Sequence, residues 1–205
     1  MNPQLVAKTW LFYGLTDLYF AFDNDDTAFS DNALFSEIMG LEKIMKAVII
    51  FHHHKEYECM TEGDAKNEIN ELAKGLGHDF NKMLKDLSQI GLSDIERIKI
   101  TAFDGHLGSD LIRAAYAGYM ETRYPVPRLI SQTFPIKGTD LKYDPLSSSG
   151  ITKFIYAICN ACFAFLALHM SLSELQIQFH RSFGHRASFS RFNNLFWEPR
   201  CRPAP

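Results

Sequence analysis

Hydrophobic side chains recur at steps of three and four residues between Ser30 and Ile90, which predicts two amphipathic segments joined by a polar hinge. Such steps place side chains on one stripe of a helix. Because a stripe of this length has to be buried against another helix, the two segments predict the centre of a helical bundle. The stripe positions are Leu34, Ile38, Leu41, Met45, Val48 and His52 in the first half, and Ile69, Leu72, Leu76, Phe80, Met83, Leu87 and Ile90 in the second.

Cap and turn residues extend the helical prediction over most of the chain. Asn2 and Pro3 predict a first helix that ends near Phe22, because asparagine caps free amide groups and proline suits a first turn. The second helix is expected to run to about Tyr57. Ser93 and Glu96 have the spacing of a capping box. Further helices are predicted over 79–90, 94–103, 109–122 and 151–179, the last with a break near Ser171, and no segment alternates as a strand does.

A long irregular stretch interrupts the helices at about residues 124–150, where four prolines and a serine run occur. The predicted fold class is therefore all-α, an up-and-down bundle of four to six helices with a long irregular insertion. The bundle is expected to form one domain over residues 1–179. A tail rich in arginine and aromatic residues follows over 180–205. Long loops inside a compact domain are often functional.

Charge and cysteine content limit the class of protein and the cellular location that we expect. The 205 residues carry a net charge of -3, which excludes a uniformly basic nucleic-acid-binding protein but not a local basic patch. Four cysteines are too few for a disulfide scaffold. The first apolar run is interrupted by Asp17 and has no cleavage site after it. We therefore expect a reducing, cytoplasmic location.

The run from Phe154 to Met170 contains no charged residue. A membrane-spanning helix needs about 20 residues, so this shorter run is expected to be a buried helix of the bundle, with no membrane contact. A membrane helix and a partner-facing helix are the alternatives. Cys159 and Cys162 lie in the run with the spacing of a redox or zinc pair. Because no strand precedes them, we expect buried core thiols.

Two short stretches carry a resemblance to a known family. Residues Gly40–Ala47 read Gly-Leu-Glu-Lys-Ile-Met-Lys-Ala, and residues Leu76–Phe80 read Leu-Gly-His-Asp-Phe. They resemble the second core helix of HEPN-type domains and the His-Asp-hydrophobic element that opens the next core helix. The resemblance covers residues 5–90. It implies a bundle of four to five helices, often paired as a homodimer, that binds nucleotides or RNA.

Many HEPN-type proteins are metal-independent RNases of toxin and antiviral systems, and these carry an arginine followed after four to six residues by a histidine. The nearest match here is Arg181 and His185, with only three residues between them. One residue fewer rotates the pair by about 100° on a helix. The main expectation is therefore a HEPN-like binding or interaction module, homodimeric, with a nucleotide, RNA or partner protein as ligand. A HEPN-type RNase or toxin component is the alternative.

Three polar residues form a further candidate cluster: His54, His78 and Asp79. Asp79 at a helix start is typical of a cap, and His78 beside it could act in acid–base chemistry if a partner met it in a cleft. Three consecutive histidines, His52–His54, spread over about 200° of a helix. Because metal ligands converge on one point, no metal or cofactor is expected, and a metal-dependent enzyme is a weaker alternative.

The tail interleaves cations with aromatic rings. Arg186, Phe189, Arg191 and Trp197 are candidate nucleic-acid-binding residues, because guanidinium groups neutralise phosphates and exposed rings stack on unpaired bases. The alternative is that the aromatic residues dock the tail on the bundle or on a second subunit.

Overall fold

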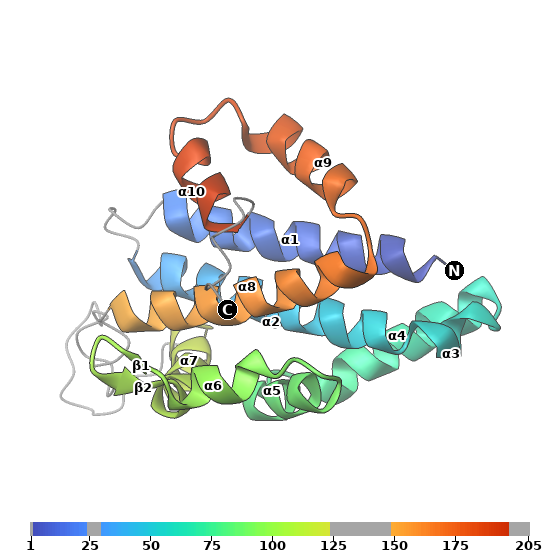
Figure 1. Ribbon diagram of the computed structural model, residues 1–205, viewed down its shortest axis with the longest axis horizontal. Coiled ribbons are helices and arrows are strands. Elements are labelled where there is room, and N and C mark those ends of the chain that lie inside the picture. The colour runs from blue at the N-terminus through green and yellow to red at the C-terminus, as the bar shows by residue number, and fades with distance from the viewer. Residues whose placement is uncertain (1, 24–29, 124–148, 197–205) are drawn as a thin grey trace, which may run out of the picture.

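The computed structural model describes residues 2–23, 30–123 and 149–196 (Figure 1). Within these residues the all-α prediction is confirmed, because helices make up the bundle and a two-stranded hairpin is the one sheet. The elements are α1 (Pro3–Asp23), α2 (Ser30–His52), α3 (His54–Glu58), α4 (Glu62–Leu76), α5 (Phe80–Gln89), α6 (Asp94–Ile100), β1 (Ala102–Phe103), β2 (His106–Leu107), α7 (Gly108–Arg123), α8 (Ser149–His169), α9 (Ser173–Phe183) and α10 (Phe189–Phe196).

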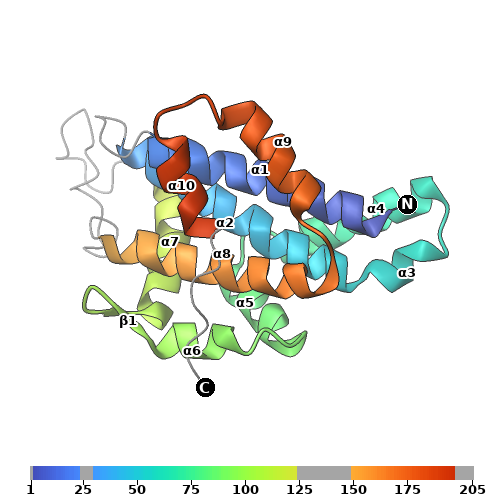
Figure 2. The ribbon, with the colours of Figure 1, turned by 45° about the horizontal axis from the view of Figure 1, so that its top comes forward.

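Helix α2 is the centre of the bundle. It contacts α1, α4, α5, α7 and α8, and every residue from Ile44 to Phe51 is buried. Figures 1 and 2 show α1 on one side of α2, with α9 and α10 lying across α1, while α5 and α6 lie on the other side. From Ala33 to Leu41 buried and half-buried residues of α2 alternate, whereas the segment from Ile44 to Phe51 is covered all round.

The two N-terminal helices cross at a pair of glycines. A Cβ atom on Gly40 would lie 2.7 Å from Leu18 Cγ and 2.8 Å from the backbone oxygen of Gly14. A Cβ atom on Gly14 would lie 2.7 Å from Ile44 Cγ1. Real Cβ atoms are not found this close to other heavy atoms, so the missing side chains let the backbones of α1 and α2 approach each other closely.

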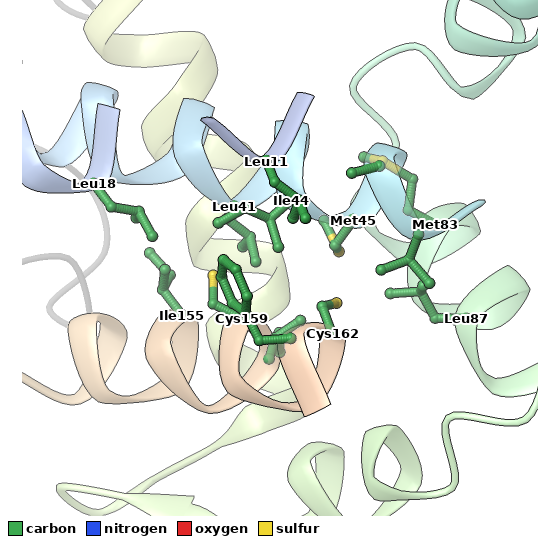
Figure 3. Packing of buried hydrophobic residues seen from close by; sticks show 14 of the residues in the cluster. Leu11, Leu18, Leu41, Ile44, Met45, Met83, Leu87, Ile155, Cys159 and Cys162 are labelled. Carbon is green, nitrogen blue, oxygen red and sulfur yellow. The ribbon is translucent and has the colours of Figure 1, made fainter. Parts of the chain in front are cut away.

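The main core lies between α1, α2, α5 and α8 (Figure 3). It combines aliphatic and aromatic side chains, with two cysteine side chains from α8 in the same cluster. This packing removes the apolar stripes of several helices from water, which is the dominant favourable term in folding. The residues labelled in Figure 3 are Leu11, Leu18, Leu41, Ile44, Met45, Met83, Leu87, Ile155, Cys159 and Cys162.

Several local predictions can be compared with the structure. The cap at Asn2 is confirmed, since its Oδ1 accepts the backbone N–H groups of Gln4 and Leu5. The break near Ser171 is confirmed between α8 and α9. The second helix is shorter than predicted, because α2 ends at His52 and a separate helix α3 follows. Residues 124–148 of the irregular insertion lie outside the described residues, and the expected boundary after residue 179 falls within α9.

The prediction of a capping box at Ser93 is wrong, and the helix predicted over 94–103 ends at Ile100. Ser93 makes no side-chain cap, because the Glu96 carboxylate instead accepts hydrogen bonds from Ser88 Oγ and Lys99 Nζ. The hairpin of β1 and β2 was not predicted. Its turn places Asp104 at φ 49° and Gly105 at φ 88°, and an Asp-Gly pair is a common choice for two such left-handed positions.

Helix α8 is, within the described part of the chain, the one helix long and apolar enough to cross a membrane by length and composition. Nine of its residues are buried in the bundle, and it packs on α2, α6, α7 and α10. The core helix of a soluble protein meets the same length and composition criterion, so this is weak evidence for a membrane span.

The cysteines of α8 are expected to resist alkylation in the folded protein. Cys159 and Cys162 are fully buried, and burial raises the pKa of both thiols, which keeps the reactive thiolate scarce. Cys59 is exposed. Iodoacetamide treatment followed by peptide mass spectrometry should modify Cys59 at least about 100-fold faster than the α8 pair, with denaturant removing the difference. Equal rates in the native protein would contradict the buried assignment.

Candidate functional site: a polar cluster around His78

Of the three buried charged residues that the structure describes in α2, two form an ion pair, and the third, Glu37, accepts from Thr152 Oγ1. Glu42 and Lys46 are only 4% and 6% exposed. They stand four residues apart, which places them on one face of the helix, and Lys46 Nζ donates to Glu42 Oε1 at 2.8 Å. Removing two charges from water is costly, and the cost is recovered only when each group keeps its hydrogen bonds. A buried ion pair of this kind therefore needs further partners.

The second partner of Glu42 is His78. This residue lies in the turn between α4 and α5, directly after Gly77, which adopts a left-handed φ of 56° that favours glycine. His78 Nδ1 lies 2.7 Å from Glu42 Oε2, so the two carboxylate oxygens hold Lys46 and His78 separately. The Glu42 side chain is 5% exposed, whereas that of His78 is 40% exposed. The cluster thus reaches the surface through the imidazole.

Helix α7 completes the cluster with Tyr119. The buried phenol oxygen lies 2.9 Å from His78 Nε2, and the two ring centroids are 4.4 Å apart. The Phe35 ring stacks on Tyr119 at 5.9 Å. Because an ionised carboxylate only accepts hydrogen bonds, Nδ1–H donates to Glu42, and in the neutral imidazole Nε2 accepts the Tyr119 O–H. Each ring nitrogen of His78 therefore has a hydrogen-bond partner, and these two partners select one tautomer of the neutral ring.

A cation lies across the same turn. Lys82, in the first turn of α5, donates from Nζ to the backbone oxygen of Gly75 at 2.8 Å. This bond spans the loop in which His78 lies, so an exposed ammonium group and a half-exposed imidazole belong to one local surface. Asp79 is used structurally: its side chain accepts the backbone N–H of Lys82 and caps α5. The arrangement suits an anionic group that approaches His78 from solvent.

His54 lies in a separate environment. Its Nδ1 is 2.7 Å from the Phe51 backbone oxygen, and the two rings stack at 5.1 Å. It lines an open pocket of about 450 Å³ together with Asn2, Gln4, Phe51, Glu58 and His169. Among the residues that the structure describes, no group of three or more His, Cys, Asp or Glu side chains could hold a metal ion.

The candidate nuclease pair is not on one helix. Arg181 is exposed in α9, which ends at Phe183, and His185 follows in the exposed turn beyond Gly184. Helix α9 lies across α1, whereas α5, which begins just after His78, lies on the other side of α2 (Figure 1). The structure therefore separates Arg181 and His185 from the cluster around His78.

Three of the four tail candidates make contacts within the chain. Phe189 is buried at 5% exposure, beside the rings of Tyr19 and Phe179. Arg186 pairs with Asp23 at 2.8 Å, and Arg191 lies over the Phe22 ring at 5.5 Å. In this arrangement the Phe189 ring is not available for base stacking. The fourth candidate, Trp197, lies outside the described residues.

Sequence patterns did not indicate Glu42, Lys46 and Tyr119 as site residues. A glutamate and a lysine four residues apart look like an ordinary surface pair on a helix. The available signal was their position, since each follows directly after a stripe residue, Leu41 or Met45. Tyr119 is 41 residues from His78, and no local sequence pattern indicates a partner at that distance along the chain.

No protein-family model, curated protein or solved structure matches this chain. The geometry of the cluster and the short resemblance in the sequence are therefore the evidence that bears on its function.

Proposed function

We propose that this chain is a HEPN-like helical binding module that contacts a ribonucleotide, free or within RNA, through the imidazole of His78. The observation that carries the proposal is the position of His78, which is the half-exposed member of an otherwise buried hydrogen-bonded cluster. Both stretches that resemble HEPN-type domains contribute to it, the first with Glu42 and Lys46 and the second with His78.

Phosphate is the part of a ribonucleotide that this geometry favours. The exposed part of the His78 imidazole and the Lys82 ammonium group lie on the same turn, so a phosphate group that binds there meets a positive charge beside the ring. Hydrogen bonds between charged groups contribute about 1.5–3 kcal/mol each, enough for specific contact by a small number of groups.

Binding is favoured over cleavage by the state of the imidazole. Acid–base catalysis needs a ring nitrogen that can exchange a proton with the substrate. Here both nitrogens already have partners within the chain, and the arginine nearest to the RNase pattern lies in α9, away from this cluster. The cluster is therefore better suited to hold an anionic ligand than to cleave one.

Replacing His78 by alanine is expected to weaken ribonucleotide binding by about 10- to 100-fold, because the ligand loses its contact with the exposed imidazole ring. Fluorescence anisotropy of a short labelled single-stranded RNA at low salt measures this loss, and competition with ATP or GTP shows whether the free nucleotide suffices. His53→Ala is a matched control, since His53 is 35% exposed and also pairs with a glutamate, Glu56, at 2.9 Å.

The binding measurements on the two variants and the unmodified protein either support or overturn the proposal. Retained binding in His53→Ala with loss in His78→Ala supports the proposal, provided that circular dichroism shows both variants folded. No binding of RNA or nucleotide by the unmodified protein, or equal loss in both variants, overturns it. Affinity should also fall as salt rises, because phosphate contacts release counterions.

A further inference from the structure

The open pocket beside His54 shares no residue with the cluster around His78. Residues of four helices line it: α1 begins there, α2 and α8 end there, and α3 contributes one face. The rings of Phe51 and His169 are 6.3 Å apart, which places the ends of α2 and α8 side by side. The pocket volume of about 450 Å³ lies within the range of small-molecule sites. A small ligand therefore fits, and the chemistry of the lining indicates its class.

The formal charge in the described lining is negative. Glu58 is exposed and follows His54 by four residues, so both side chains lie on one face of α3. No lysine or arginine is among the described residues that line the pocket, and Glu58 forms no ion pair with any residue that the structure describes. A cationic ligand would therefore meet a carboxylate without a counter-ion, whereas an anionic ligand would be repelled.

His54 adds a second hydrogen-bond acceptor. Its Nδ1 lies 2.7 Å from the backbone oxygen of Phe51. Because a carbonyl oxygen only accepts, Nδ1–H donates, and Nε2 of the neutral ring is left as an acceptor. Stacking on the Phe51 ring at 5.1 Å fixes the plane of the imidazole. The C-terminal ends of α2 and α8 contribute the partial negative charge of their last carbonyl groups.

The start of α1 offers no backbone donor to an anion. Pro3 has no N–H group. The Asn2 side chain accepts the N–H groups of Gln4 and Leu5, and its backbone oxygen accepts that of Val6 at 3.2 Å. The amide groups that bind anions at other helix N-termini are thus already used within the chain. The pocket favours a ligand that donates hydrogen bonds.

We propose that this pocket binds a small aliphatic amine in its ammonium form, with the Glu58 carboxylate as counter-ion and His54 Nε2 as a second acceptor. A primary ammonium group has three donors and no acceptor, which matches a lining that presents acceptors. This inference goes beyond ribonucleotide binding at His78 and does not depend on it.

Three ligands with the same number of carbon atoms test the charge that the pocket selects. In calorimetric titrations, 1,4-diaminobutane should bind at least about 10-fold more tightly than 1,4-butanediol, because hydrogen bonds between charged groups are the stronger ones. Succinate should not bind. N-acetyl-lysine methylamide presents the same ammonium group on a peptide backbone. Weaker binding of this compound than of the diamine supports a free amine as the ligand, and tighter binding overturns that assignment.

Variants of the lining test the place of binding. Glu58→Gln should weaken binding of the diamine by about 10-fold or more, because the counter-ion is lost. Glu56→Gln is the matched control, since Glu56 lies in the same helix, is 62% exposed and pairs with His53. Gln4→Arg should abolish binding, because its guanidinium group competes for the same acceptors, whereas Gln4→Glu should strengthen it. Circular dichroism shows whether each variant is folded.

Several results would overturn the proposal. They are the absence of diamine binding, equal affinity for the diamine and the diol, or binding of succinate. Equal losses in Glu58→Gln and Glu56→Gln, or unchanged binding in Gln4→Arg, would show that the amine binds elsewhere. RNA binding is measured with a different ligand and a different variant, so failure of the amine site is distinguishable from failure of the ribonucleotide site.

Discussion

Gly40→Ala should lower the free energy of unfolding by about 2 kcal/mol, although alanine is the better helix former by about 1 kcal/mol. The reason is the crossing of α1 and α2. The added Cβ atom would lie 2.8 Å from the backbone oxygen of Gly14 and 2.7 Å from Leu18 Cγ, so the two central helices have to move apart. Urea denaturation followed by far-UV circular dichroism measures the change.

Two other glycines give the comparison its controls. Gly63→Ala, in α4 with nothing within 4 Å of the new Cβ, should raise stability by up to about 1 kcal/mol through helix propensity. Gly14→Ala would place its Cβ atom 2.7 Å from the side-chain atom Ile44 Cγ1 and 3.0 Å from the backbone oxygen of Gly40. It should cost somewhat less than Gly40→Ala, because its closest contact is a side chain that can shift and its backbone contact is longer. If Gly40→Ala and Gly63→Ala changed stability alike, the close crossing would be refuted.

Glu42→Ala should cost about 3–5 kcal/mol of stability, because it leaves the Lys46 ammonium group in the interior without its carboxylate. It also removes the acceptor of the His78 N–H group. Glu42→Gln should cost less, since the amide oxygen still accepts one hydrogen bond. Urea denaturation of the unmodified protein, Glu42→Ala and Glu42→Gln ranks their free energies of unfolding.

The double variant Glu42→Leu, Lys46→Met distinguishes a buried pair from a surface one. Apolar residues of similar size often replace a buried ion pair with no net loss, so the double variant should recover most of the stability that Glu42→Ala loses. A surface pair contributes about 0–1 kcal/mol. A loss below 1 kcal/mol in Glu42→Ala, or no recovery in the double variant, would show that the pair is not buried as described.

The periodicity of hydrophobic residues predicted the helices well where one face is buried. It did not indicate that part of a helix is buried on all its faces. The stripe from Leu34 to Val48 is real, but Ile49 and Ile50 are also buried, because side chains of α1, α3 and α4 pack around Ile50 at that end of α2. The hairpin was missed for a different reason. Two-residue strands are too short to alternate, although the Asp104-Gly105 pair was a turn signal.

The site was predicted only in part. The sequence indicated His78 and Asp79 as candidate residues. It left open whether they cap a helix or take part in acid–base chemistry. It could not show that Glu42 and Lys46 are buried, because the burial of two residues four apart depends on which other elements cover their face of the helix. Nor could it decide between docking and nucleic-acid contact for Phe189. That choice depended on the aromatic cluster of α1 and α9, which forms only in the folded chain.

The contact of His78 with Glu42 ties a surface turn to the centre of the bundle. Glu42 also holds Lys46, and both residues lie on α2, which contacts most of the other helices. Opening of the turn between α4 and α5 would therefore expose a buried carboxylate to solvent. The backbone amides of this turn should for that reason exchange their hydrogens more slowly than those of other surface turns.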